Sequence, residues 1–412
     1  MKYDVLILGG GAAGLMAGTE LAKAGLRTAI LEKGPRVGKK LAATGNGRCN
    51  LTNLHCTAKD YGRAAAFVSQ AMEAFPPETV LERFFEMGVP YVADEEGRAY
   101  PVGNQATGVL DAMRASFAEN GGEEIVDCAV EKLIRKGDIW QVRCADGRMF
   151  TAPNVIYAMG GQAAPNLGGC PDGVRMLKDM GYAAKPCFPA LTPLKCDHPR
   201  LKSLKGIRAA GSVTLRIDKK DVATETGEIL FQDYGLSGIA VMQLSGAAAE
   251  ALSRNRRVEI RMNLCGMHPR AALIALKKRR DMLPQRPAEN FLTGWMNKRL
   301  GQTLIKMAGC DDLLTPACDL TDAQLDALAD IMTGWTIPVT ASPGFAQAQV
   351  TRGGIDTAEI DPATLQSRRH PGLYITGEVL DVDGPCGGYN LQWAWASALC
   401  ACRNILTTQE RA

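Results

Sequence analysis

The sequence predicts an α/β fold: a Rossmann-like nucleotide-binding domain with an inserted antiparallel, barrel-like β domain and a helical domain. Three observations predict it. An apolar strand pattern at the N-terminus leads into a glycine turn and a helical pattern. The middle of the chain changes to β-branched and then to helical patterns. The C-terminal residues return to an alternation of strand and helix, which would complete the first domain.

The first strand, turn and helix carry a glycine fingerprint. The apolar run at residues 3–8 leads into Gly9, Gly11 and Gly14, and Glu32 closes the next apolar run. Glycines at this spacing allow a tight turn, let the backbone approach a pyrophosphate and let the helix pack close to the strand. The helix N-terminus then offers its N–H groups to phosphates, and Glu32 can accept hydrogen bonds from ribose hydroxyls. The pattern favours a dinucleotide site over a glycine turn that serves only the fold.

The remaining elements follow from hydrophobic periodicity and from turn residues. Helical patterns cover residues 64–87, broken at Pro76 and Pro77, and residues 108–120, and later residues 393–405. Strand patterns occur at residues 124–130, 139–144, 149–151, 154–157, 212–218, 224–232 and 372–376, and residues 268–335 are mostly helical. These changes of pattern predict a nucleotide-binding domain at 1–190 completed by 355–412, an antiparallel β domain at 191–265 with 336–354, and a helical insert at 266–335.

Composition excludes several classes of protein. The 412 residues are 46% hydrophobic and 22% charged with a net charge of +3, which indicates a globular protein and gives no reason to expect a nucleic-acid partner. The basic run at residues 277–280 is interpreted as a solvated helix face. There is no apolar stretch of about 20 residues, so no membrane span is predicted. Thirteen cysteines without a CxxC pair indicate reduced thiols in a cytoplasmic protein, and the four histidines are not spaced for a metal site.

Two further glycine-rich loops accompany the N-terminal fingerprint. Residues 38–53 combine glycines and small polar residues with cations, and Arg48 directly follows Gly47. Such a loop can offer backbone N–H groups and a guanidinium to a phosphate. Residues 377–392 comprise a strand end with Glu378 and then a second glycine-rich loop that leads into a helix. The N-terminus of that helix can face an electron-rich ring edge or a phosphate.

At this point the chain resembles a known family. The N-terminal fingerprint and the strand ends at residues 158–160 and 377–378 are similar to the FAD motifs of the glutathione-reductase-like flavoprotein superfamily. The runs at residues 44–53, 227–238 and 387–392 resemble the BaiN/YhiN family of NAD(P)/FAD-dependent oxidoreductases. The resemblance implies a resident FAD held by Gly9, Gly11, Ala12, Ala13, Gly14, Glu32, Lys33, Lys40, Asn46, Gly47, Arg48, Cys49, Val130, Gly160, Gly377, Glu378, Gly388, Asn390 and Leu391.

The resemblance also implies a reaction, an FAD-dependent oxidoreduction on CH–CH groups. The expected reaction is NAD(P)H-driven reduction of a C=C bond conjugated to a ketone, in a small apolar substrate such as a 3-oxo-Δ4/Δ6 bile-acid-like steroid. Hydride would pass from flavin N5 to the β-carbon. No second GxGxxG motif follows a later strand, so NADH or NADPH is expected to bind transiently.

The catalytic residues stay open at this stage. Tyr389, Cys386 and Tyr234 are weak candidates for the proton donor or for a redox thiol. Two other functions also stay open: an oxidase that uses O₂ on a small amine or ketone, and a flavoprotein that binds RNA or a protein partner through the helical insert. For the RNA alternative, the residues to test are the run at 277–280 together with Lys298 and Arg299.

Overall fold

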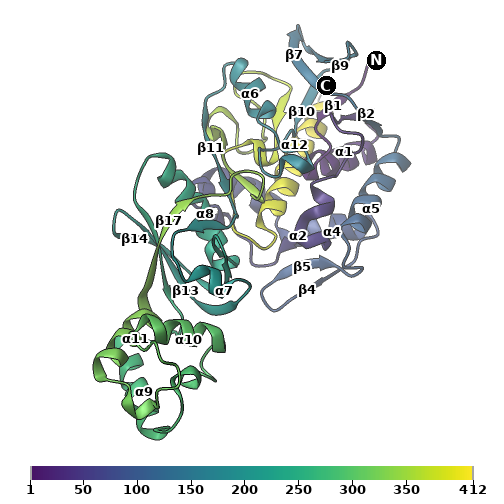
Figure 1. The fold of residues 1–412 in the computed structure, drawn as a ribbon. Helices are drawn as coiled ribbons and strands as arrows, with labels where there is room; N and C mark the ends of the chain where they lie inside the picture. Colours follow the sequence, from purple (N-terminus) through teal and green to yellow (C-terminus); the bar gives the residue numbers. More distant parts are fainter. Residues whose placement is uncertain (1, 411–412) are drawn as a thin grey trace. The chain divides into compact units, whose positions relative to one another are not determined.

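The computed structural model describes residues 2–410, and the chain divides into two compact units. The first unit comprises residues 1–187 and 349–412, and the second comprises residues 188–348. Figure 1 shows the elements of both units along the chain.

A five-stranded parallel sheet is the centre of the first unit. Its strand order is β19-β10-β1-β2-β6, and every neighbouring pair is parallel. The strands are β1 (Val5–Leu8), β2 (Thr28–Leu31), β6 (Glu123–Ile125), β10 (Asn154–Tyr157) and β19 (Leu373–Ile375). The four strands other than β6 are almost wholly buried, as expected for a parallel sheet covered on both faces. The edge strand β19 comes from the C-terminal part of the chain and pairs with β10.

Helices from both ends of the chain cover the sheet. The N-terminal helix α1 (Ala12–Lys23) packs against α5 (Ala106–Glu119) and against α12 (Tyr389–Glu410), which is yellow beside the purple α1 in Figure 1. The predicted helical region at 64–87 is two helices, because Pro77 begins a new helix after the break. The helices not yet named are α2 (Thr44–Gly47), α3 (Ala65–Ala74), α4 (Pro77–Glu86) and α6 (Asp172–Asp179).

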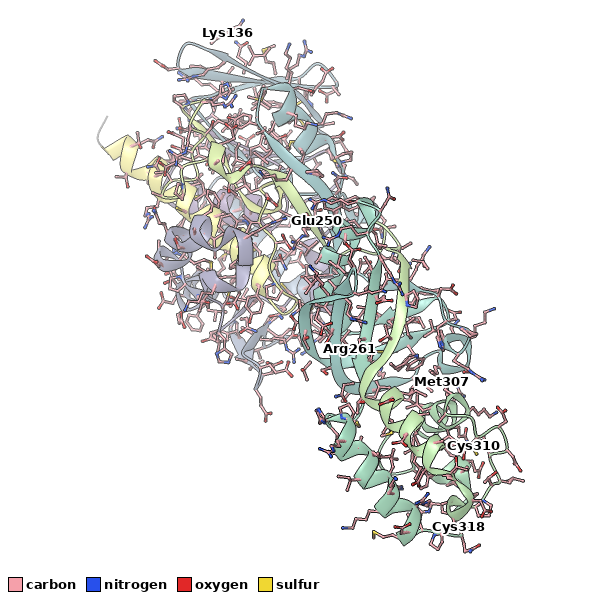
Figure 2. The ribbon with its side chains drawn as sticks, turned by 90° about the vertical axis from the view of Figure 1, so that its left-hand side faces the viewer. Lys136, Glu250, Arg261, Met307, Cys310 and Cys318 are labelled. Carbon is pink, nitrogen blue, oxygen red and sulfur yellow. The ribbon has the colours of Figure 1, made fainter. Side chains whose placement is uncertain are left out.

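Smaller sheets flank the central one. Their strands are β3 (Thr52–Asn53), β4 (Tyr91–Ala93) and β5 (Arg98–Pro101); β7 (Val130–Lys136), β8 (Ile139–Cys144) and β9 (Met149–Ala152); and β11 (Ala184–Ala190) with β18 (Val350–Ile355). Figure 2 labels Lys136 at the end of β7.

Strand β18 includes residues that the sequence analysis grouped with the β domain, and it lies instead in the first unit. The reason is a close approach to the neighbouring strand. A Cβ on Gly353 would lie 2.1 Å from the carbonyl oxygen of Pro186, so only glycine allows it. The predicted domain limits themselves stay a prediction.

The second unit contains a closed six-stranded antiparallel barrel. The strand order is β12-β15-β14-β13-β16-β17. Val213, Phe231, Ile260 and Ile337 are fully buried in its core. The strands are β12 (Leu194–Cys196), β13 (Arg208–Ile217), β14 (Lys220–Gln232), β15 (Gly235–Ser237), β16 (Val258–Asn263) and β17 (Trp335–Ala341). Figure 2 labels Arg261 on β16. The helices of this part are α7 (Leu201–Leu204) and α8 (Ile239–Ser253).

Three helices follow β16 and precede β17. They are α9 (Pro269–Met282), α10 (Lys298–Met307) and α11 (Asp322–Gly334). Lys277 and Arg280 on α9 both donate to Asp322 at the start of α11, each at 2.8 Å, and Arg279 donates to the carbonyl oxygen of Thr293 at 2.7 Å. These cations therefore bind partners within the insert, and the side chains of Lys277 and Asp322 remain 37% and 59% exposed, which agrees with a solvated helix face. Among residues 2–410, no helix combines the length and the apolar character needed to cross a bilayer.

A polar cluster in the first unit contains a histidine whose pKa is lowered by burial. The hydroxyls of Tyr182 and Ser367 are hydrogen-bonded, and the Tyr182 hydroxyl lies 2.8 Å from Nδ1 of His370. Burial, followed by the charges of Arg135 and Arg369, lowers the pKa of His370. The unfolded chain therefore takes up a proton more readily than the folded chain as the pH falls below the usual histidine value of about 6.5.

We expect the protein to lose stability as the pH falls from about 7.5 to about 5.5, because His370 becomes protonated in the unfolded state first. A His370→Asn variant should show a smaller difference in Tm between these two pH values. Thermal denaturation of both proteins at the two pH values tests this. An equal pH dependence in the variant would contradict it.

Candidate functional site

The turn between β1 and α1 is shaped by three glycines with different surroundings. Gly9 has a φ of 102°, and a Cβ there would lie 2.5 Å from the carbonyl oxygen of Ala158, just after β10. A Cβ on Gly14 would lie 1.9 Å from the carbonyl oxygen of Gly9. Both positions exclude a side chain and bring strand, turn and helix together. A Cβ on Gly11 would have no atom within 4 Å, so open space faces the turn there.

The N-terminus of α1 faces this space without a side-chain cap. Within residues 2–410, its N-cap makes no side-chain hydrogen bond, and its first turn contains no acidic residue. The first hydrogen bond within the helix runs from the N–H of Leu15 to the carbonyl of Gly11, at 2.9 Å. The N–H groups of Ala12, Ala13 and Gly14 therefore have no acceptor within the helix. Together with the positive end of the helix dipole, they suit an anion.

Glu32 organises the next part of the site. Its Oε2 accepts the N–H of Gly10 at 2.9 Å, and its Oε1 accepts the N–H of Gly34 at 2.8 Å. Each carboxylate oxygen keeps a second lone pair for a ribose hydroxyl. The carbonyl of Glu32 accepts the N–H of Cys128 at 2.9 Å, which brings the start of β7 at Val130 to this turn.

An ion pair joins segments that lie far apart in the sequence. Nζ of Lys40 lies 2.7 Å from Oε2 of Glu378, and the N–H of Thr351 donates to Oε1 of Glu378 at 2.8 Å. Gly160 and Gly377, which follow β10 and β19, have φ values of 72° and 73°. No atom lies within 4 Å of a Cβ at Gly160, so the site is open here as well.

The loop after α1 and β2 presents a guanidinium. Asn46 adopts a left-handed conformation with a φ of 56°. Nε of Arg48 donates to Oδ1 of Asn104 at 2.6 Å, and the guanidinium carbon lies 4.1 Å from the ring centroid of Tyr100. These neutral partners orient Arg48 and leave its charge uncompensated by them. Burial raises the pKa of Cys49 to about 11, so its thiol stays protonated at neutral pH.

The second glycine loop is folded by Asn390 at the start of α12. Its Oδ1 accepts the N–H of Gly384 at 2.9 Å, and its Nδ2 donates to the Gly384 carbonyl at 2.8 Å. A Cβ on Gly388 would lie 2.4 Å from the carbonyl carbon of Thr52, so this loop contacts β3 through glycine. Oδ1 of Asn50 is buried beside it and has no hydrogen-bond partner. A buried acceptor of this kind fits a ligand N–H or O–H.

A charged cluster next to this loop was not singled out from the sequence. Nη2 of Arg63 lies 2.5 Å from Oδ1 of Asp381 and 3.4 Å from Oδ1 of Asp383, and Nη1 of Arg352 lies 3.3 Å from Oδ2 of Asp383. We call these four residues the Arg–Asp cluster. Burial raises the pKa of Asp381. The run Asp-x-Asp-Gly was the available signal, but the two arginines come from distant segments.

The three candidate catalytic residues are divided between the two units. Cys386 lies in the second glycine loop and Tyr389 begins α12, and burial raises the pKa of each. The Tyr389 carbonyl accepts the hydroxyl of Tyr61 at 2.8 Å. Tyr234 lies in the second unit, in the turn between β14 and β15. Among residues 2–410, no group of three or more His, Cys, Asp or Glu could hold a metal ion.

The predicted cofactor residues all lie in the first unit, on the turns and loops described above or directly beside them. The HI0933-like protein Rossmann domain family matches residues 3–404 of the chain. The chain belongs to the HI0933-like family. This confirms the family resemblance and the predicted fold class. As a member of this family, the protein is an FAD-dependent oxidoreductase.

Two curated relatives span nearly the whole HI0933-like chain. A 3-dehydro-bile acid delta(4,6)-reductase of Clostridium scindens is 36% identical and covers 96% of this chain and 97% of its own length. A ribosomal RNA dihydrouridine synthase of Escherichia coli is 28% identical and covers 99% of both chains. The prediction that the protein has no nucleic-acid partner therefore stays untested. Among solved structures, the 3-ketosteroid delta1-dehydrogenase of Sterolibacterium denitrificans has a TM-score of 0.54 at 13% identity, covering 99% of this chain and 100% of its own, and shows the shared fold.

Two features of the HI0933-like chain fit an FAD. The open space at Gly11 faces uncapped helix amides, which suit a pyrophosphate. Within residues 2–410, Oδ1 of Asn50 is buried without a hydrogen-bond partner, and the backbone of Gly388 packs closely against Thr52. Both features suit a flat ligand that approaches the backbone closely. Which residues contact the cofactor stays a prediction.

Proposed function

We propose that this protein is an NAD(P)H-driven, FAD-dependent reductase of C=C bonds conjugated to a carbonyl group, and that its substrate is a 3-oxo-Δ4/Δ6 bile-acid-like steroid. The observation that carries the proposal is the 36% identity to a bile-acid reductase over 96% of the chain. The second relative supports the reaction type, because forming dihydrouridine from uridine also saturates a C=C bond conjugated to a carbonyl. Neither relative favours the alternative of an oxidase.

The reaction divides its tasks between cofactor and chain. A bound FAD, once reduced by NAD(P)H, would supply the hydride for the β-carbon of the substrate. The chain must stabilise the negative charge that develops on the carbonyl oxygen and deliver a proton to the α-carbon. Arg352 and Arg63 are the proposed donors to that oxygen, because Asp383 lies within 3.4 Å of both guanidinium groups beside the second glycine loop. Tyr389 is the proposed proton carrier, since it begins the helix after the second glycine loop and a tyrosine hydroxyl is protonated at neutral pH.

Anaerobic mixing of the FAD-loaded protein with NADH or NADPH tests the proposal. Loss of the oxidised flavin absorbance, followed by its return when a 3-oxo-Δ4,6 bile acid is added, is the expected result. Mass spectrometry should show that the product has gained two hydrogen atoms. A flavin that neither nicotinamide reduces would contradict the proposal. Reduction by an amine, with fast reoxidation in air, would instead identify an oxidase.

A second candidate substrate is a uracil ring in RNA, and the charge of the second unit favours it. Residues 188–348 contain 21 Lys and Arg against 16 Asp and Glu, whereas the whole chain has a net charge of only +3. Lys205, Lys298 and Arg299 line a cavity of about 460 Å³ beside the start of α10. Lys205 and Lys298 also lie 2.7 and 3.5 Å from Asp233 and Glu289. Cations around a depression suit the phosphate backbone.

If RNA is the substrate, a Lys298→Glu/Arg299→Glu variant should bind a ribosomal RNA fragment about tenfold more weakly, with a shallower dependence on salt. Lys219→Glu/Lys220→Glu, which makes the same charge change at two exposed neighbouring positions of the turn from β13 to β14, is the matched control and should have a smaller effect. Filter binding at two salt concentrations measures both. Absent binding, or binding that salt does not weaken, would exclude this candidate.

A further inference from the structure

Two buried thiols meet in the antiparallel sheet next to the site. Cys128 precedes β7 and Cys144 ends β8, and their Sγ atoms lie 2.8 Å apart. Each residue is only 1% exposed. The backbone holds the two segments together, because Val130 pairs with Cys144 and the N–H of Ala145 donates to the Ala129 carbonyl at 2.9 Å. A disulfide requires an S–S distance of about 2.05 Å, so a shift of less than about 1 Å would suffice.

The other cysteines are not arranged in this way. Cys400 and Cys402 lie on the same helix, and their thiols donate to the carbonyls of Ala363 and Ala17. Figure 2 labels Cys310 and Cys318 on the helical part, where their thiols donate to Asp312 and Asp319. In contrast, the thiols of Cys128 and Cys144 face each other directly.

This pair adjoins the backbone that positions Glu32. The N–H of Cys128 donates to the Glu32 carbonyl, and the N–H of Asp127 donates to the Gly34 carbonyl, each at 2.9 Å. On the other side, Nη2 of Arg148 donates to the Asp127 carbonyl at 2.7 Å. A covalent bond between the thiols would therefore fix the turn against which Glu32 is held.

We propose that Cys128 and Cys144 form a reversible dithiol–disulfide site, and that the disulfide fastens the turn at Glu32 and slows the release of FAD. The proposal rests on the FAD site and is independent of the substrate. Two S–H bonds break, one S–S bond forms, and two electrons and two protons pass to hydrogen peroxide, which becomes two molecules of water. A peroxide is small enough to reach sulfur atoms that a larger oxidant cannot contact. Burial raises the pKa of Cys144 to about 12, so oxidation is slow.

The test uses the FAD-loaded full chain. After treatment with hydrogen peroxide, mass spectrometry of a digest made without reductant should show a linked pair of peptides that contain Cys128 and Cys144. FAD release, measured by the rise of free flavin fluorescence after dilution, should become several-fold slower. Dithiothreitol should reverse both effects. Neither measurement needs catalytic turnover, so the result is separate from that for the proposed reductase.

Cys144→Ala and Cys128→Ser should remove the linked peptides and the effect of peroxide on FAD release. Cys196→Ser, which removes a buried thiol of the second unit, is the matched control. It should still form the linked peptides and still release FAD more slowly after peroxide treatment. If a variant does not fold, the rates of FAD release from the oxidised and the reduced wild-type protein still test the proposal. A folded wild-type protein that forms no linked peptides, or linked peptides with unchanged FAD release, would overturn the proposal.

Discussion

Valine at position 11 is expected to leave the protein folded but unable to retain FAD. The backbone of Gly11 is extended, with a φ of −83°, so a side chain is compatible with it. A Cβ there meets no atom of the chain within 4 Å. The side chain would instead occupy the space in front of the uncapped amides of α1, where the pyrophosphate is proposed to lie. FAD should bind about 100-fold more weakly, which corresponds to about 2.7 kcal/mol.

Titration of the apoprotein with FAD and thermal denaturation without FAD measure the two parts of this prediction for Gly11→Val. Gly108→Ala is the control, because its Cβ also meets no atom and its site is on α5, away from the turn. Gly14→Val is the opposite case, since its Cβ would clash with the Gly9 carbonyl, and it should unfold or aggregate. If Gly11→Val bound FAD as tightly as the wild-type protein, the cofactor could not lie at this turn.

The sequence predicted the parts of the fold that depend on local patterns. The spacing of Gly9, Gly11 and Gly14 is enough to predict a tight turn between strand and helix. In the structure, Gly9 and Gly14 are closely packed against the backbone and Gly11 faces open space. The C-terminal strand β19 was expected in the sheet because a buried strand pattern ends in a glycine turn there. Turn residues and apolar periodicity specify such elements without knowledge of distant contacts.

Long-range contacts are what the sequence did not predict. The basic run at residues 277–280 gives no sign of its partner Asp322, which lies more than 40 positions further along the chain. The Arg–Asp cluster joins residues that are about 320 positions apart in the case of Arg63 and Asp383. The meeting of Cys128 and Cys144 depends on the register of β7 and β8. Pairings of this kind follow from tertiary structure, and one sequence contains no direct signal for them.

The Arg352→Met variant is expected to lose most of its reductase activity while it keeps its FAD. Methionine keeps much of the length of the side chain but removes the guanidinium that is proposed to stabilise the carbonyl oxygen. Removal of one such donor lowers kcat by about 100-fold to 1,000-fold. Asp383→Asn should have a smaller effect, because it loosens Arg352 and Arg63 without removing either positive charge.

Rapid-reaction measurements separate the proposed role of Arg352 from a structural one. Reduction of the flavin by NADH or NADPH should proceed at the normal rate in Arg352→Met, whereas its reoxidation by the conjugated substrate should be slow. The control is Arg368→Met, since Arg368 lies in the same unit and pairs with Asp361 at 4.0 Å on the surface, a contact of little energy. Equal slowing of both half-reactions, or loss of bound FAD, would show that Arg352 maintains the site and does not polarise the substrate. A donor that acts on the developing charge affects only the step in which that charge forms, so the half-reaction that is slowed identifies the role of Arg352.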